Sequence, residues 1–124
     1  MLARPLIITM LLFSTAPSFA AGDPERGKQQ FSVCSSCHSV QAGGPKKLGP
    51  SLSGVVGRRA GSEREYLTYS KGLQESGMVW SPENLDRFLA DPIKTIPGTK
   101  MTIGKVTNMQ TRANIIAYLA SLSK

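Results

Sequence analysis

The chain has 124 residues, with 15 Lys and Arg against 8 Asp and Glu, two cysteines and one histidine. This length allows one domain and excludes a second independently folded core. The formal net charge of +7 suits an acidic protein partner, an anionic membrane surface or a nucleic acid.

The first twenty residues have the pattern of a secretory signal peptide. Arg4 is the only charged residue there, residues 6–13 are an apolar run, and the segment ends in a small-x-small pattern at Ala20. The run is far shorter than the roughly 20 residues of a membrane-spanning helix. We predict a signal peptide over 1–20 and a mature domain over 21–124, with an uncleaved anchor as the alternative. Because export and scattered basic residues argue against nucleic acid, we favour an acidic protein partner.

Pairs of capping residues mark the starts of four predicted helices. The pairs are Asp23 with Pro24, Ser62 with Glu65, Ser81 with Pro82, and Thr107 with Gln110. The first helix should run to about Val33 and the second to about Tyr69. The third should stop before Asp91 and Pro92, and the fourth should continue to the C-terminus.

Glycine and proline predict long loops between these helices. Residues 39–61 and 93–106 are loops by this criterion, and Gly72 and Gly77 make the segment after the second helix irregular. No strand periodicity is visible, so the fold class is all-α. Loops this long are unusual in a compact domain. Only 40% of the residues are hydrophobic. A cofactor at the centre, against which the loops pack, would explain both the loops and this apolar content.

The sequence Cys34-Ser35-Ser36-Cys37-His38 carries the main chemical signal. C-x-x-C-H is the attachment pattern of c-type haem. Two thiols at this spacing add to the two vinyl groups at one edge of the porphyrin, and the adjacent imidazole reaches the iron. We therefore predict one covalently attached haem c, with Cys34 and Cys37 as attachment points and His38 as an iron ligand.

Three other interpretations of the motif are weaker. A thioredoxin-type dithiol belongs to a βαβ context that this sequence lacks. A structural zinc site would need a fourth ligand, and the chain has no further Cys or His. A disulfide between Cys34 and Cys37 would close a very short loop and stabilise the fold little.

The second axial ligand of the iron is left open by the residues themselves. A second imidazole is excluded, because His38 is the only histidine. Met78, Met101, Met109, a lysine or water are the candidates. Met101 follows Pro97 and Gly98 in a loop that would present its thioether, although a loop methionine is by itself more often a packing residue.

Six ordered blocks give the mature chain a family resemblance. They are CSSCHSV at 34–40, LGPSLSGVVGRRAG at 48–61, SGMVW at 76–80, LDRFLADP at 85–92, IPGTKM at 96–101 and IIAYL at 115–119. Together they resemble the class I cytochromes c, including the mitochondrial and bacterial members, over essentially all of residues 22–124. The resemblance implies the cytochrome c fold, in which several helices and glycine-rich loops wrap around one haem.

The resemblance also implies roles for individual residues. His38 and Met101 would be the axial ligands of the iron, and the Pro50 carbonyl would accept a hydrogen bond from the His38 ring. The remaining matched positions are Arg58, Tyr69 and Trp80 near a haem propionate, Thr99 and Lys100 in the segment covering the haem, and Gly27 and Phe31 against Tyr118 where the first and last helices cross. Phe88 departs from the pattern, because many relatives have a tyrosine there whose hydroxyl approaches the methionine sulfur.

The implied function is one-electron transfer rather than catalysis. We expect a monomeric carrier in the bacterial periplasm, steered by Lys47 and Lys100 toward acidic redox partners such as a cytochrome reductase complex, a terminal oxidase, a reaction centre or a dehydrogenase. Peripheral contact with a membrane is left open. The alternatives are a haem peroxidase or gas-binding protein with an open sixth position, which carbon monoxide binding would reveal, and a thiol-disulfide oxidoreductase with free cysteines.

Overall fold

Short helices separated by long loops make up the computed structural model, which describes residues 1–3, 10–12 and 21–122. The elements in chain order are α1 (Pro24–Gln30), the 3-10 helix η1 (Phe31–Val33), α2 (Lys71–Glu75), α3 (Pro82–Ala90), α4 (Pro92–Thr95) and α5 (Met109–Ser121). The described residues contain no strand beyond an isolated bridge between Arg59 and Val79. The all-α prediction is confirmed. Most of the predicted signal peptide lies outside the described residues.

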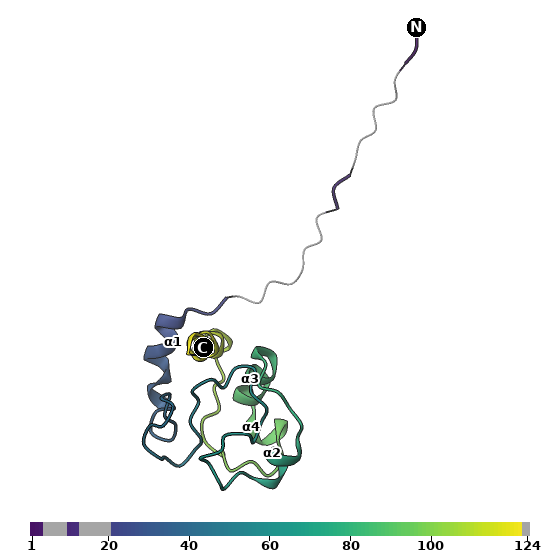
Figure 1. Cartoon of the computed structure of the whole chain (residues 1–124). Coiled ribbons are helices and arrows are strands. Elements are labelled where there is room, and N and C mark those ends of the chain that lie inside the picture. Colours follow the sequence, from purple (N-terminus) through teal and green to yellow (C-terminus); the bar gives the residue numbers. More distant parts are fainter. Residues whose placement is uncertain (4–9, 13–20, 123–124) are drawn as a thin grey trace.

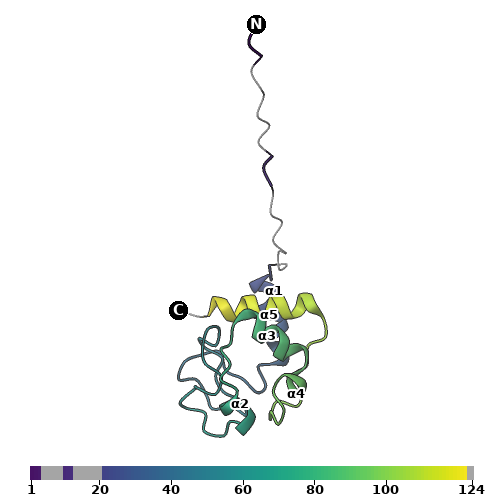
Figure 2. The same ribbon diagram turned by 90° about the vertical axis from the view of Figure 1, so that its right-hand side faces the viewer.

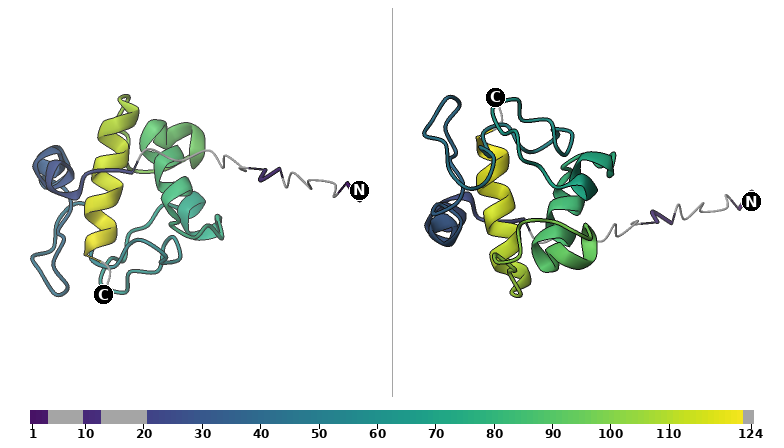
Figure 3. Two further views of the ribbon diagram at one scale, coloured as in Figure 1. Left: turned by 90° about the horizontal axis from the view of Figure 1, so that it is seen from above. Right: turned by 90° about the horizontal axis from the view of Figure 1, so that it is seen from below.

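The helix α5 lies between α1 and α3 and packs against both (Figure 1; Figure 3). A Cβ added to Gly27 in α1 would lie 1.9 Å from the Asn114 carbonyl oxygen and 2.9 Å from the Tyr118 Cβ in α5. Only a residue without a side chain therefore permits this crossing. Beside it the rings of Phe31 and Tyr118 meet edge to face, with centroids 5.5 Å apart.

A buried asparagine stabilises the same crossing of α1 and α5 through hydrogen bonds. The Asn114 side chain is 2 % exposed, and its oxygen accepts from the Asp23 backbone N–H at 2.8 Å and from the Gln110 amide at 3.0 Å. Its amide nitrogen donates to Gln30 at 3.1 Å. Because a buried polar group is stable only when it is paired, this network fixes how α1 and α5 meet.

The helix α3 is tied to α5 and to the loop that precedes α5. The Arg112 Nε lies 2.7 Å from an Asp86 carboxylate oxygen, and one Arg112 Nη donates to the carbonyls of Val106 and Thr107. Arg112 is buried, and this set of partners satisfies its guanidinium. The end of the loop over residues 96–107 is thereby held against both helices (Figure 2).

Two of the predicted helix starts are correct, and the helix predicted after Ser62 is wrong. The Asp23 and Ser81 side chains cap α1 and α3, and α3 ends at Ala90 before Asp91, as predicted. The Ser62 hydroxyl donates instead to the Arg59 carbonyl, and residues 62–69 are irregular apart from a turn at Arg64 and Glu65. The capping pattern failed there because the Ser62 hydroxyl bonds to a backbone carbonyl that precedes it.

The helix α2 lies in a segment predicted to be irregular. Ser70 caps it through a hydrogen bond from the Leu73 backbone N–H. A Cβ on Gly72 would lie 2.4 Å from the Pro97 carbonyl oxygen. Gly72 therefore serves the close approach of α2 to the 96–107 loop and does not break the helix.

Two smaller corrections concern the C-terminal half. The predicted loop over 93–106 begins inside α4, which the Asp91 side chain caps. The helix α5 is capped by Asn108 rather than Thr107, because the Asn108 side chain accepts from the Thr111 N–H at 2.9 Å. The Thr107 carbonyl serves Arg112 instead. Of the described residues, no helix is long and apolar enough to cross a membrane.

Candidate functional site

The loops and helices enclose a cavity of about 390 Å³. This volume lies in the range of about 300–1,000 Å³ that is usual for cofactor sites. Its walls are mostly apolar and include Phe31, Leu52, Val55, Trp80, Leu85, Phe88, Leu89, Ile115 and Leu119. A space of this size inside the core of so short a chain agrees with the prediction that a cofactor completes that core.

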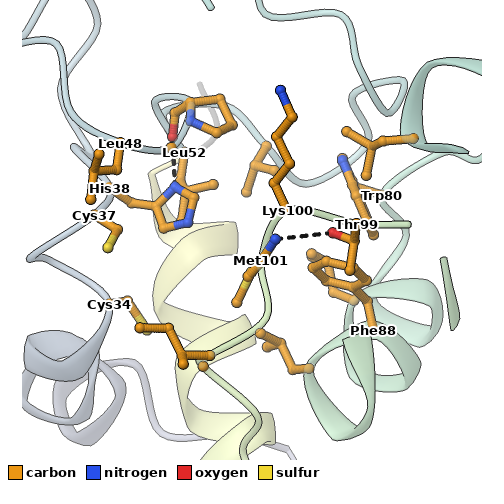
Figure 4. Close-up of a pocket in the computed structure, with 18 of the residues that line it drawn as sticks. Cys34, Cys37, His38, Leu48, Leu52, Trp80, Phe88, Thr99, Lys100 and Met101 are labelled. Carbon is orange, nitrogen blue, oxygen red and sulfur yellow. Dashed lines mark hydrogen bonds between the residues drawn. The ribbon is translucent and has the colours of Figure 1, made fainter. Parts of the chain in front are cut away.

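Ten of the eleven predicted site residues line this cavity. They are Cys34, Cys37, His38, Pro50, Arg58, Tyr69, Trp80, Thr99, Lys100 and Met101. They come from four separate parts of the chain, and Figure 4 shows the Cys34–His38 segment and the Thr99–Met101 segment reaching into the cavity from different sides. Lys47 is the exception and borders a neighbouring hollow.

The C-x-x-C-H segment is held in a tight turn at the end of η1. The Cys34 N–H donates to the Phe31 carbonyl, and the N–H groups of Cys37 and His38 both donate to the Cys34 carbonyl. This turn brings the two thiols and the imidazole to one wall of the cavity. Both thiols are unpaired and half-buried, and burial, with the charge of Cys37, raises the pKa of the Cys34 thiol.

The His38 ring is oriented by two backbone features. Its Nδ1 donates to the Pro50 carbonyl at 2.7 Å, as the resemblance implied. A Cβ on Gly49 would lie 2.4 Å from the His38 Cε1, so the ring packs directly on the Gly49 backbone. Because Nδ1 carries the proton in this hydrogen bond, Nε2 keeps the lone pair that a metal requires.

Burial lowers the pKa of His38, and the nearby Lys47 charge acts in the same direction, against the hydrogen bond to Pro50. The lowered pKa favours the neutral imidazole, which is the form that ligates a metal.

Among the three candidate methionines, Met101 lines the cavity. Its backbone N–H donates to the Thr99 hydroxyl at 3.3 Å, and Thr99 is buried. Met109 is 73 % exposed, and Met78 packs at the edge of the hydrophobic core. The structure thus brings one thioether and one imidazole, 63 positions apart in the sequence, to the same cavity.

Arg58 and Tyr69 bring polar groups to the cavity. The Arg58 guanidinium donates to the carbonyls of Ser53 at 3.0 Å and Ser51 at 2.9 Å. The Tyr69 hydroxyl accepts from the Glu63 N–H at 3.1 Å, and burial is the main cause that raises the pKa of this phenol. Arg58 and Tyr69 therefore offer a cation and a neutral hydroxyl at the wall of an otherwise apolar space.

The two lysines expected to steer partners are exposed, and each also bonds to the backbone. The Lys100 ammonium donates to the Thr68 carbonyl and the Lys47 ammonium donates to the Ser35 carbonyl. Both bonds cross between segments that surround the cavity. The lysines therefore lie close to the site, although charge patterning alone does not reveal these bonds.

Sequence reasoning missed three further residues of the site. Gly49 supports the His38 ring, Tyr66 donates to the Leu48 carbonyl at 3.0 Å beside the cavity, and Glu63 pairs with Arg58. The only available signal was a glycine next to Pro50. The other two contacts depend on how the 62–69 turns fold back, which no spacing rule captures.

The residues present fit a covalently bound haem c. Two unpaired thiols and a neutral imidazole with its lone pair available line an apolar cavity that also receives a thioether and an arginine. These donors match haem chemistry better than a metal ion alone, because the described residues hold no cluster of three or more His, Cys, Asp or Glu. The fold and the site together define a c-type cytochrome.

Comparison with known proteins identifies the family. The pattern of the Cytochrome c family matches residues 24–123, and the chain belongs to that family. It is 41% identical over 107 residues to cytochrome c2 of Rhodomicrobium vannielii, and the aligned region covers 86% of this chain and 85% of the cytochrome c2. It is 46% identical over 102 residues to cytochrome c2 of Rhodopila globiformis, covering 82% and 94%.

A solved structure shows the same fold. Cytochrome cH from Methylobacterium extorquens superposes with a TM-score of 0.75 at 37% identity, covering 81% of this chain and 99% of that one. The cofactor is accordingly one haem c, bound through the C-x-x-C-H motif, and the protein is an electron carrier by family.

Proposed function

We propose that the protein is a one-electron carrier of the bacterial periplasm whose haem iron is ligated by His38 and Met101. The observation that carries this proposal is the convergence of these two side chains on one cavity (Figure 4). Two protein ligands leave no open coordination position. A carrier needs none, whereas a peroxidase or a gas-binding protein requires one.

The haem supplies a one-electron couple, and the chain determines how that couple is held. The Cys34 and Cys37 thiols would hold the haem, since addition of each S–H to one vinyl double bond forms a thioether without any oxidant. The hydrogen bond to Pro50 fixes the plane of the His38 ring. Met101 contributes a neutral sulfur, which favours the reduced state and raises the potential.

The apolar wall excludes water and also favours the reduced state of the haem. Trp80, Phe88 and Leu85 are each less than 10 % exposed, so the surroundings have a low dielectric. A low dielectric disfavours the additional positive charge of the oxidised state. A haem held in this way would supply a one-electron couple that works without breaking any bond to the protein.

The decisive test uses the absorption spectrum of the protein expressed in cells able to attach haem. We expect a weak near-red band from sulfur-to-ferric-iron charge transfer and no binding of carbon monoxide to the ferrous protein. Covalent haem without this band, together with ready carbon monoxide binding, would support an enzyme or a sensor with an open position.

Electron exchange with an anionic reagent should be fast at low salt and slow at high salt. The formal charge of the full chain is +7, of which the predicted signal peptide carries only that of Arg4. Screening shortens the reach of surface charge from about 30 Å at 0.01 M to about 8 Å at 0.15 M salt. With ferricyanide as oxidant, we expect the second-order rate constant to fall about fivefold or more across this range. Stopped-flow absorbance measures the rate constant.

Variants of two lysines locate this effect. Lys47→Gln and Lys100→Gln should each reduce the rate at low salt more than Arg26→Gln does, because Arg26 is an exposed residue of α1 that lines neither the cavity nor the neighbouring hollow. Equal effects of all three substitutions, or a rate independent of salt, would argue against steering through Lys47 and Lys100.

The residue Phe88 should tune the potential. It is buried, lies at the cavity, and packs on Trp80 with ring centroids 5.1 Å apart. A hydroxyl introduced by Phe88→Tyr would donate toward the Met101 sulfur and weaken its donation to ferric iron. We expect the midpoint potential to rise by about 30 mV, a threefold change in the relative stability of the two states at 59 mV per tenfold. An unchanged midpoint by redox titration would contradict this.

A further inference from the structure

An ion pair at the cavity wall links the cavity to an acidic residue outside it. The Arg58 Nη1 lies 3.2 Å from a Glu63 carboxylate oxygen, and the two side chains are 18% and 24% exposed. Arg58 lines the main cavity. Glu63 lines the adjacent hollow between residues 42–53 and 63–68. Arg58 therefore borders the haem cavity and also pairs with a carboxylate that borders the adjacent hollow.

Both members of the pair are held in place by the backbone. Besides Glu63, the Arg58 guanidinium donates to the carbonyls of Ser51 and Ser53. The second Glu63 carboxylate oxygen accepts from the Glu65 N–H at 3.3 Å, and the Glu63 N–H donates to the Tyr69 hydroxyl. A pair with this many partners keeps its geometry, unlike a loose pair of surface side chains.

The charges of this pair act at the cavity. Burial is the main cause that raises the pKa of the Tyr69 phenol, which lines the cavity; the hydrogen bond from the Glu63 N–H and the Arg58 charge lower this pKa, and the Glu63 charge raises it. Partly desolvated charges interact at an effective dielectric nearer about 20 than 80. A charge that acts on the phenol therefore also acts on a redox centre bound in the same cavity.

We propose that Glu63 is a positioning residue that sets the reduction potential, because its carboxylate orients the Arg58 guanidinium and offsets its charge at the haem. This inference rests on the proposed function. A cation beside the cavity stabilises the reduced, less positive state. The carboxylate opposes that effect and, by holding the guanidinium, limits how far Arg58 turns toward an acidic group of the cofactor.

The substitution Glu63→Gln tests the proposal because it removes the charge with little change in shape. We expect the reduced state to gain about threefold in relative stability, which raises the midpoint potential by about 28 mV at 59 mV per tenfold. Glu65→Gln is the matched control, since Glu65 is exposed and lies in the same loop. It makes the same change in net charge and should leave the midpoint within a few millivolts, on the order of the long-range screened effect.

Two further variants separate orientation from general charge. Glu63→Asp keeps the charge and should remain nearer to the parent potential than Glu63→Gln. In an Arg58→Gln background the Glu63→Gln shift should be clearly smaller, because the part that comes from orienting the guanidinium is lost and only the direct effect of the carboxylate charge is left. The free energy of unfolding, measured with guanidinium chloride, shows whether each variant retains the fold.

Equal shifts from Glu63→Gln and Glu65→Gln, or an unchanged Glu63→Gln shift without Arg58, would overturn the proposal. If the protein has covalent haem and the near-red band but its potential does not respond to Glu63→Gln, only this inference is wrong. If the native protein lacks the band, the proposed ligation by His38 and Met101 is wrong instead. The two failures are therefore distinguishable.

Discussion

Replacing Met101 with alanine should abolish the near-red absorption band and open the iron to carbon monoxide. Met101 lines the cavity that also receives the His38 imidazole, and alanine has no group that reaches the metal. Loss of the neutral sulfur removes a preference for the reduced state. We expect the midpoint potential to fall by on the order of 100 mV, which is about a 50-fold change in relative stability at 59 mV per tenfold.

Met109→Ala is the control for this substitution. Met109 begins α5 and is 73 % exposed, so its removal should leave the spectrum, the carbon monoxide response and the potential unchanged. If Met101→Ala retained the band, another group would be the sixth ligand. Met78→Ala would then identify it, because Met78 is partly buried against the hydrophobic core.

Replacing Gly27 with alanine should cost about 3 kcal/mol of unfolding free energy. The new Cβ would lie 1.9 Å from the Asn114 carbonyl oxygen and 2.5 Å from its carbon, both backbone atoms of α5. Neither helix can move away without breaking the Asn114 hydrogen bonds. Forced overpacking of this kind typically costs about 1–3 kcal/mol. In a domain of this size, the melting temperature should fall by roughly 4–8 °C per kcal/mol.

Gln29→Ala controls for helix propensity at the same place. Gln29 is exposed in α1, and alanine is a better helix former than either glutamine or glycine. Thermal unfolding followed by circular dichroism should therefore show little change for Gln29→Ala and a large loss for Gly27→Ala. A Gly27→Ala protein as stable as the parent would mean that the two helices lie further apart.

Local chemistry accounts for what was predicted correctly. The C-x-x-C-H motif places both thiols and the imidazole within five consecutive residues, so its spacing alone indicates covalent haem. The starts of α1 and α3 follow from a capping side chain beside a proline, which is also a local rule. The capping box predicted from Ser62 and Glu65, which has no proline beside it, failed, and the Ser62 hydroxyl donates to the Arg59 carbonyl three residues earlier.

Contacts between distant segments account for what was not predictable. Gly72 lies within α2 because that helix approaches the Pro97 carbonyl too closely for a side chain, which no local pattern reveals. Glu63 had no assigned role, since its pairing with Arg58 depends on the turns that follow Gly61. Residue type and spacing carry no information about which loops fold against each other.

The sequence by itself determined the all-α class and the covalent cofactor, and it predicted His38 as one iron ligand, because periodicity, loop composition and the C-x-x-C-H motif are all local features of the chain. Its own residues left three methionines as candidates for the other ligand, and only the resemblance favoured Met101. The tertiary structure decided the rest. It brings Met101 to the cavity that His38 also lines, although the two residues are 63 positions apart in the sequence. It also packs Gly49 against the His38 ring and pairs Glu63 with Arg58. These arrangements arise from long-range packing, in which the loops close around a common centre.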